Sequence, residues 1–137
     1  MKILLLGQSG QVGWELQRAL APLGEIVALD HDRTANPDGL HGDFSRPEAL
    51  AATVAAVRPD LIVNAAAHTA VDKAESEPEL ARAINASTPG LVARWAAAHG
   101  AWLVHYSTDY VFDGSGSAAR DETAATAPLS VYGRTKR

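Results

Sequence analysis

A glycine-rich turn occupies residues 7–13, between an apolar run at residues 3–6 and a segment whose apolar residues recur at helical spacing over 14–23. Gly7, Gly10 and Gly13 would permit a tight turn, a close approach of the backbone to a pyrophosphate, and close packing of the helix on the strand. Free N–H groups and the positive dipole end at the start of that helix favour a phosphate. A strand, a glycine turn and a helix in this order predict a dinucleotide-binding unit.

Short apolar runs alternate with helical patterns along the rest of the chain. The expected elements are strands at residues 26–29, 61–63 and 102–106, and helices at 45–57, at 78–100 and from 131 onward. Ser45 is the predicted N-cap of the helix at 45–57, in a capping box with Glu48. Uniformly apolar strands are typical of a parallel sheet buried on both faces. The pattern therefore predicts an α/β fold, a Rossmann-like doubly wound parallel sheet with its ligand outside the carboxyl ends of the strands.

Composition narrows the class of protein further. The 137 residues fit one domain. A net charge of −4 gives no general attraction for nucleic acid or an anionic membrane. The chain has no cysteine, which excludes disulfides and thiolate chemistry. No apolar run approaches the length of about 18 residues that a membrane span needs, and the run at residues 3–6 is too short for a signal peptide. A cytoplasmic protein is expected.

Asp30 closes the second expected strand, at the position where an acid binds the adenosine ribose hydroxyls. An acid there favours NADH, because it would repel the 2′-phosphate of NADPH. Arg33 lies three residues further along and would offset that repulsion by pairing with the phosphate. The residues therefore leave the choice between NADH and NADPH open, and Asp30 also suits a role as a turn former.

A Tyr and a Lys stand four residues apart where the last helix is expected. Tyr132 and Lys136 would share one face of that helix. The ammonium would stabilise the phenolate, so that the tyrosine can exchange a proton with a substrate oxygen. Thr108 follows the strand at 102–106, and its hydroxyl would hold a substrate carbonyl for hydride attack. These groups predict a nicotinamide-dependent oxidoreductase.

Three longer stretches, at residues 10–16, 64–75 and 107–114, are similar to the dTDP-4-dehydrorhamnose reductase family of the extended short-chain dehydrogenase/reductase superfamily. The resemblance extends over essentially the whole chain. It implies reduction of the 4-keto group of dTDP-4-dehydro-6-deoxy-L-mannose to dTDP-L-rhamnose with NADPH or NADH, and a dTDP-sugar as the binding partner. The stretch at 107–114 distinguishes the chain from sister epimerases and dehydratases.

The resemblance also assigns roles to particular residues. Thr108, Tyr132 and Lys136 match the catalytic triad. Thr69, Asp109 and Tyr110 would face the nicotinamide or the sugar. Asp43 and Phe44 would border the adenine after a third strand, which makes the strand at 102–106 the fifth. The residues expected to contact the cofactor are Gly7, Gly10, Gln11, Val12, Gly13, Asp30, Asp43, Phe44, Ala66, Ala67, His68, Tyr132 and Lys136.

A metal and a dimer are further implications of the resemblance. Some members bind Mg²⁺ at a dimer contact through a Glu that matches Glu15, although one carboxylate is a poor site by itself and a solvated helix residue is the simpler interpretation. His68 also suits a metal ligand or a general base, but with no second His nearby a position lining the cofactor is favoured. The expected state is a monomer or a homodimer.

Family members are about twice as long, so residues 1–137 are expected to form an incomplete NAD(P)-binding Rossmann domain without the last strands and the substrate-binding part. A helix that stops one turn after nucleation is marginal. A frayed catalytic helix and weak or absent turnover by this chain are therefore expected. Two alternatives remain: a non-catalytic dinucleotide-binding regulatory subunit, against which the complete Thr108, Tyr132 and Lys136 set argues, and an epimerase or dehydratase that retains NAD⁺.

Overall fold

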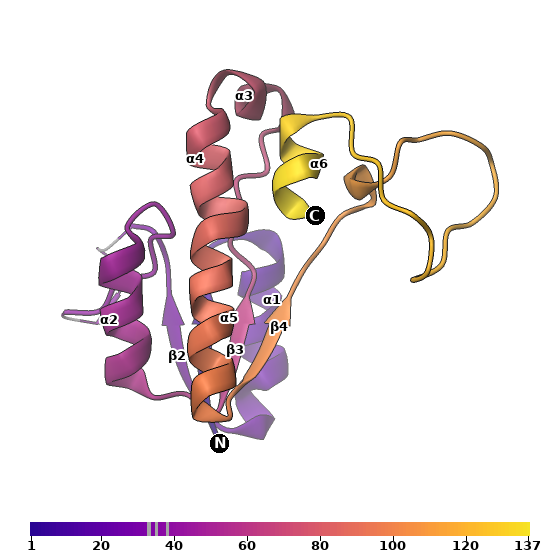
Figure 1. Cartoon of the computed structure of the whole chain (residues 1–137). Coiled ribbons are helices and arrows are strands. Elements are labelled where there is room, and N and C mark those ends of the chain that lie inside the picture. The colour runs from indigo at the N-terminus through magenta and orange to yellow at the C-terminus, as the bar shows by residue number, and fades with distance from the viewer. Residues whose placement is uncertain (33, 35, 38) are drawn as a thin grey trace.

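The computed structural model describes residues 1–32, 34, 36–37 and 39–137 and contains one parallel sheet (Figure 1). Its strands are β1 (Lys2–Leu6), β2 (Glu25–Leu29), β3 (Leu61–Asn64) and β4 (Trp102–His105), in the order β2-β1-β3-β4. The register pairs Leu6 with both Leu29 and Asn64, and Asn64 with His105. All four strands therefore end at one edge of the sheet, which is where the predicted site residues follow.

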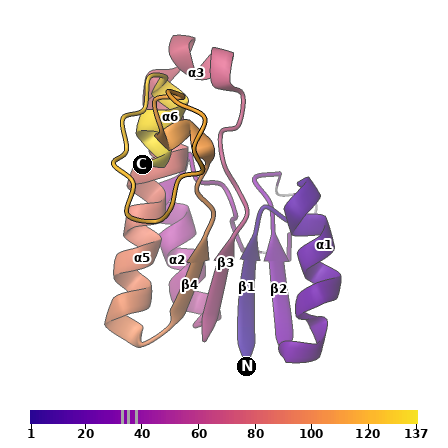
Figure 2. The ribbon, with the colours of Figure 1, turned by 90° about the vertical axis from the view of Figure 1, so that its right-hand side faces the viewer.

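Helices cover both faces of the sheet, with α1 on one side and α2 and α5 on the other (Figure 2). The helices are α1 (Gln11–Leu20), α2 (Pro47–Val57) and α5 (Thr88–His99), and a 3₁₀ turn η1 (Ala21–Leu23) continues α1. Side chains of β1 alternate between the two cores, because Ile3 and Leu5 pack toward α1 while Leu4 and Leu6 pack toward α2 and α5. This arrangement confirms the predicted Rossmann-like doubly wound α/β fold.

The expected third strand ahead of Asp43 is wrong, since the described residues between β2 and α2 contain no strand. The N–H of His41 donates to the Thr53 hydroxyl of α2 at 2.8 Å, and the N–H of Leu40 donates to the Pro37 carbonyl at 3.1 Å. These backbone groups are used by α2 and by a turn instead of a strand ladder. The strand at 102–105 is accordingly the fourth, not the fifth.

The predicted capping box at Ser45 is also wrong. Helix α2 begins at Pro47 with Arg46 as its N-cap, and no side chain caps it. Proline is well suited to the first helical position because its ring presets the backbone angle and its missing N–H costs nothing there. The N–H and hydroxyl of Ser45 instead donate to the Asp43 carboxylate at 2.8 and 2.7 Å, forming an Asx turn before the helix.

The helical stretch predicted at 78–100 is continuous but changes its hydrogen-bond pattern. It consists of α4 (Pro78–Arg82), a π-helical turn η3 (Ala83–Ser87) and α5, which ends at Gly100. Pro89 has no N–H to donate to the preceding turn, which favours a local shift of the ladder. A short helix α3 (Val71–Ser76), not predicted from the sequence, precedes this stretch, and α6 (Val131–Lys136) confirms the predicted last helix.

Strand β4 is covered on one face only. Leu103 packs on the core beneath α2 and α5, while the alternate residues Trp102 and Val104 are 77% and 43% exposed. A single 3₁₀ turn, η4 (Asp109–Val111), and a long loop lead from β4 to α6. Within the part of the chain that the structure describes, no helix has the length and apolarity needed to cross a bilayer.

The α5 hydroxyl of Thr88 holds the chain just before α2, because it donates to the buried Phe44 carbonyl at 2.8 Å. We expect Thr88→Val, which keeps the shape and removes the donor, to lower the free energy of unfolding by about 1–3 kcal/mol in urea titrations. Thr123→Val is the control, because that hydroxyl bonds Asp121 in an exposed loop, and it should stay within about 0.5 kcal/mol of the parent. Equal losses in both variants would contradict the role of the Thr88 contact.

Candidate cofactor and catalytic site

The glycine turn is packed so tightly that no side chain would fit at two of its three glycines. Gly7 has a φ of +87°, and a Cβ there would lie 2.7 Å from the Ala66 nitrogen. A Cβ on Gly13 would lie 1.9 Å from the Gly7 carbonyl oxygen. The N–H of Gly7 donates to the Leu29 carbonyl at 2.9 Å, which anchors the turn to the end of β2. The turn therefore lies against both neighbouring strands at the carboxyl edge of the sheet.

The start of α1 opens onto a cavity of about 550 Å³. Gly10 is the N-cap of α1, no side chain caps the helix, and its first turn has no acidic residue. First-turn N–H groups have no partner inside a helix, and they carry its positive dipole end. A Cβ on Gly10 would meet only the Gly7 carbonyl oxygen, at 3.5 Å, so this side of the turn is open. The residues therefore fit a phosphate-bearing dinucleotide. The cavity is lined by Gly7, Ser9, Gly10, Gln11, Val12, Asp30, His31, Ala65, Ala66, Ala67 and Thr69.

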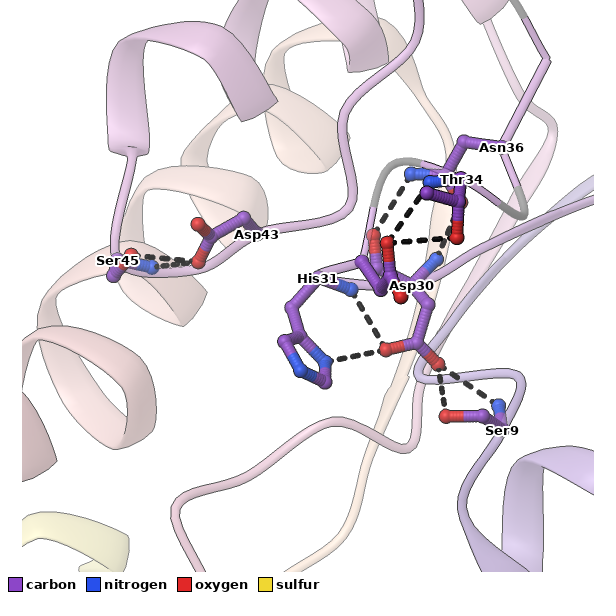
Figure 3. Close-up of polar contacts among 8 residues, drawn as sticks. Ser9, Asp30, His31, Thr34, Asn36, Asp43 and Ser45 are labelled. Carbon is purple, nitrogen blue, oxygen red and sulfur yellow. Dashed lines mark hydrogen bonds and ion pairs between the residues drawn. The ribbon is translucent and has the colours of Figure 1, made fainter.

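Asp30 is 4% exposed and accepts four hydrogen bonds from its neighbours (Figure 3). One oxygen accepts from the N–H and the hydroxyl of Ser9 at 2.9 and 2.5 Å, and the other from the N–H and ring Nδ1 of His31 at 2.7 and 2.5 Å. Burial acts to raise the pKa of Asp30, but the bonds from Ser9 and His31 outweigh it and hold that pKa below its ordinary value. Asp30 thus ties β2 to the glycine turn. Arg33 lies outside the described residues.

Asp43 and Phe44 are not among the residues that line this cavity. The Asp43 carboxylate accepts from Ser45, and Phe44 is 3% exposed within the core beneath α2 and α5. Their predicted contact with adenine is therefore not visible in the described cavity.

Residues 64–69 form the opposite wall. The Asn64 amide oxygen accepts from the Ala66 N–H at 3.0 Å, and its nitrogen donates to Nδ1 of His105 at 3.0 Å. Ala66, Ala67 and Thr69 are among the residues that line the cavity, and His68 is not. It lies 3.4 Å from the Glu77 carboxylate, and hydrogen bonds from His68 and Lys73 lower the pKa of Glu77.

Helix α6 is well anchored, so the expected fraying of the catalytic helix is wrong. The Ser130 hydroxyl accepts from the Gly133 N–H at 3.0 Å, and the Glu75 carboxylate accepts from the Val131 N–H at 2.7 Å. Gly133 packs against the Tyr110 backbone, because a Cβ there would lie 2.2 Å from the Tyr110 oxygen. Tertiary contacts thus stabilise a helix that is too short to form alone.

Lys136 is 8% exposed, and its ammonium donates to the Tyr106 carbonyl at 2.5 Å. Burial lowers the pKa of Lys136. Burial first, and then the nearby Lys136 charge, lower the pKa of His105. The Tyr132 ring meets the Tyr110 ring edge-on, with centroids 5.5 Å apart. Helix α6 is therefore fixed to the residue that follows β4.

Thr108 begins the η4 turn that packs against α6. Its hydroxyl accepts from the Tyr110 N–H at 3.3 Å and donates to the Asp109 carboxylate at 3.1 Å. The predicted residues Thr108, Asp109 and Tyr110 consequently share one corner of the molecule with Tyr132 and Lys136.

Asn85 joins the cavity wall to the catalytic helix, and sequence reasoning missed it. It is 3% exposed in the π-helical turn. Its oxygen accepts from the His68 N–H at 2.8 Å, and its nitrogen donates to the His68 carbonyl and the Thr135 hydroxyl, both at 3.1 Å. The one signal in the sequence was that Asn85 is a polar residue inside an Ala-rich helix, three residues before Thr88.

Glu15 does not fit a Mg²⁺ site within this chain. Its carboxylate accepts from the Arg18 guanidinium at 2.6 Å on the exposed face of α1. Over residues 1–32, 34, 36–37 and 39–137, no three His, Cys, Asp or Glu side chains gather as metal ligands. Mg²⁺ takes several oxygen ligands in near-octahedral geometry, which one paired carboxylate does not supply.

The fold and the site define a Rossmann-type domain with an open cavity at the start of α1 and a Tyr-x-x-x-Lys helix at the carboxyl edge of its sheet. The family described as RmlD substrate binding domain matches residues 1–137. The chain belongs to this family.

Relatives and solved structures agree with this assignment. The chain is 62% identical, over 99% of its length, to the dTDP-4-dehydrorhamnose reductase of Escherichia coli K12. The crystal structure of a dTDP-4-dehydrorhamnose reductase from Clostridium acetobutylicum superposes with a TM-score of 0.87 at 38% identity, over 99% of this chain and 46% of that one. That of the Bacillus anthracis enzyme, in complex with NADP, gives 0.82 at 36% identity, over 98% and 46%. The chain spans 44% of the length of the E. coli relative.

Gly13 and Gly10, two of the three glycines of the turn, allow a matched test of its packing. Gly13→Ala places a methyl group against the Gly7 carbonyl, so we expect the free energy of unfolding to fall by about 1–3 kcal/mol or more. Gly10→Ala meets open space, and we expect a loss below about 1 kcal/mol, mainly from the poorer N-cap. Urea titration of both variants checks the difference, and a larger loss in Gly10→Ala would refute the packing.

Proposed function

We propose that the whole protein to which this chain belongs reduces the 4-keto group of dTDP-4-dehydro-6-deoxy-L-mannose to dTDP-L-rhamnose with NADPH or NADH. The observation that carries this proposal is that α6, which bears Tyr132 and Lys136, is anchored just beyond the end of β4, at the same carboxyl edge of the sheet as the open cavity at the start of α1. Asn85 links the two parts through His68 and Thr135. The substrate is inferred from the relatives that are named dTDP-4-dehydrorhamnose reductase.

The cofactor would lie along the cavity at the carboxyl edge of the sheet. The N–H groups at the start of α1, around Gln11 and Val12, would bind its pyrophosphate. Ala66, Ala67 and Thr69 would form the wall further along. NADPH or NADH, when bound, supplies the hydride. The NADP complex of the Bacillus anthracis relative supports a nicotinamide cofactor for this chain.

Tyr132 would donate its hydroxyl proton to the substrate oxygen as the carbonyl becomes an alcohol. The buried Lys136 ammonium, fixed by the Tyr106 carbonyl, would stabilise the phenolate that remains. Thr108 would orient the carbonyl by a hydrogen bond, after its hydroxyl turns away from Asp109. Thr69, Asp109 and Tyr110 would face the nicotinamide or the sugar, and the exposure of Tyr110, 49%, beside Tyr132 supports its part in this.

The 137-residue chain by itself should bind the cofactor but turn over weakly or not at all. It covers 44% of the length of the E. coli relative, and most of the sugar-nucleotide pocket would belong to the remaining part. A cytoplasmic location and a monomeric or homodimeric state belong to the same proposal.

The variant Tyr132→Phe separates chemistry from binding. In a protein extended to the length of the relatives, we expect turnover of the dTDP-4-keto-sugar to fall by about 10²–10⁴-fold, because the proton donor is lost. Cofactor affinity, followed by fluorescence titration, should change by less than about threefold, within the free energy of one weak hydrogen bond.

Other outcomes would point elsewhere. If the parent protein binds NADPH or NADH but consumes neither with this substrate, the reductase proposal fails and a regulatory subunit gains support. If the purified protein retains NAD⁺ and returns the substrate without net oxidation, an epimerase or dehydratase is supported instead.

A further inference from the structure

The residue next to Asp30 lies where the two nicotinamide cofactors differ. In Rossmann domains the end of the second strand meets the adenosine ribose, which carries a 2′-hydroxyl in NADH and a 2′-phosphate in NADPH. Asp30 directly follows β2 here, and His31 lines the same cavity as the glycine turn. The His31 side chain is 80% exposed, whereas that of Asp30 is 6% exposed. The imidazole is therefore the more accessible group at this end of the cavity.

The Asp30 carboxylate has little capacity left for a ribose hydroxyl. A carboxylate offers about four acceptor sites, and Ser9 and His31 occupy four with distances of 2.5–2.9 Å. Figure 3 shows Ser9 and His31 approaching the carboxylate from two sides. Asp30 accordingly acts as an internal clamp that fixes the His31 ring through Nδ1.

The clamp determines what the other ring nitrogen can do. Because Nδ1 donates to Asp30, a neutral imidazole has an acceptor at Nε2 and repels a phosphate oxygen. A protonated imidazole has an N–H donor and a positive charge there, which suit a phosphate. Histidine changes between these forms between about pH 5 and 8.

Among the described residues, the charged groups next to the imidazole are carboxylates. Asp30, directly after β2, contacts it, and Asp32 lies in the same loop, where hydrogen bonds from Thr34 and then the His31 charge lower the pKa of Asp32. Ser9 of the turn and residues 65–67 of the opposite wall bring no charge. Beside a neutral imidazole, a 2′-phosphate would therefore face the carboxylates of Asp30 and Asp32.

We propose that His31 selects the cofactor by its charge: the protonated imidazole binds the 2′-phosphate of NADP(H), and the neutral form leaves the site to NAD(H). The inference rests on the proposed cofactor cavity and gives it a specificity-determining residue. The chain is then a dual-cofactor binder whose preference shifts toward NADP(H) as the pH falls. Ionised Asp30 is needed in both forms, to hold the ring.

The test measures the affinity ratio of NADP⁺ to NAD⁺ by calorimetry at pH 6.0 and 8.5, using the protein at the length of its relatives. His31→Gln keeps a polar side chain without a titratable charge, and His31→Arg keeps the charge at both pH values. His99→Gln is the control, because that imidazole lies at the end of α5, stacked on Trp95. A 2′-phosphate itself titrates near pH 6, so the pH effect is read as the difference between the parent and His31→Gln.

We expect the parent ratio to favour NADP⁺ about tenfold more at pH 6.0 than at pH 8.5 beyond the change seen in His31→Gln, as for one charge-assisted hydrogen bond. His31→Arg should favour NADP⁺ at both pH values, and His99→Gln should match the parent. If His31→Gln retains the parent ratio and its pH dependence, the proposal is overturned. If Arg33→Gln abolishes NADP⁺ binding while His31→Gln does not, Arg33 is the selecting residue. Failure of the parent to bind either dinucleotide would instead refute the cofactor site itself.

Discussion

The site depends on three backbone segments that touch with no side chain between them. The turn at Gly7 lies against Ala65 and Ala66, and the start of α1 at Gly13 lies against the Gly7 carbonyl. This close approach places the first N–H groups of α1 at the carboxyl edge of the sheet, facing the 64–69 wall. A methyl group at either contact would separate the helix from the strand, so the phosphate site and the sheet are built by the same packing.

The second contact that organises the site is polar and is made by the buried Asn85 side chain. Asn85 is buried between the His68 backbone and Thr135, so it ties the cavity wall to the helix of Tyr132 and Lys136. A buried amide that satisfies three partners is costly to remove and specific in its geometry. Together with the Lys136 bond to Tyr106, just after β4, and the Gly133 contact with η4, it gives the six-residue helix α6 a defined position.

Periodicity and local chemistry predicted much of this arrangement. The apolar runs form the four strands, the glycine turn joins β1 to α1, and the Tyr-Lys pair lies within the last helix. Ser45 is not the N-cap, because its N–H and hydroxyl are held by the Asp43 carboxylate in an Asx turn and the helix starts at Pro47, one residue later than expected. The contacts of Asn85, and the hydrogen bonds from Ser9 to Asp30, escaped prediction because partners far apart in sequence leave no periodic signal.

The account claims that the glycine turn, the 64–69 wall and α6 form one cofactor site. Hydrogen exchange of the protein at the length of its relatives, with and without saturating NADPH, tests this most directly. The account predicts slower amide exchange in residues 7–13, 64–69 and 131–136 together, with the slowing at 131–136 diminished in Asn85→Ala. Slowing at 7–13 with unchanged exchange at 131–136 in the parent protein would contradict a single coupled site.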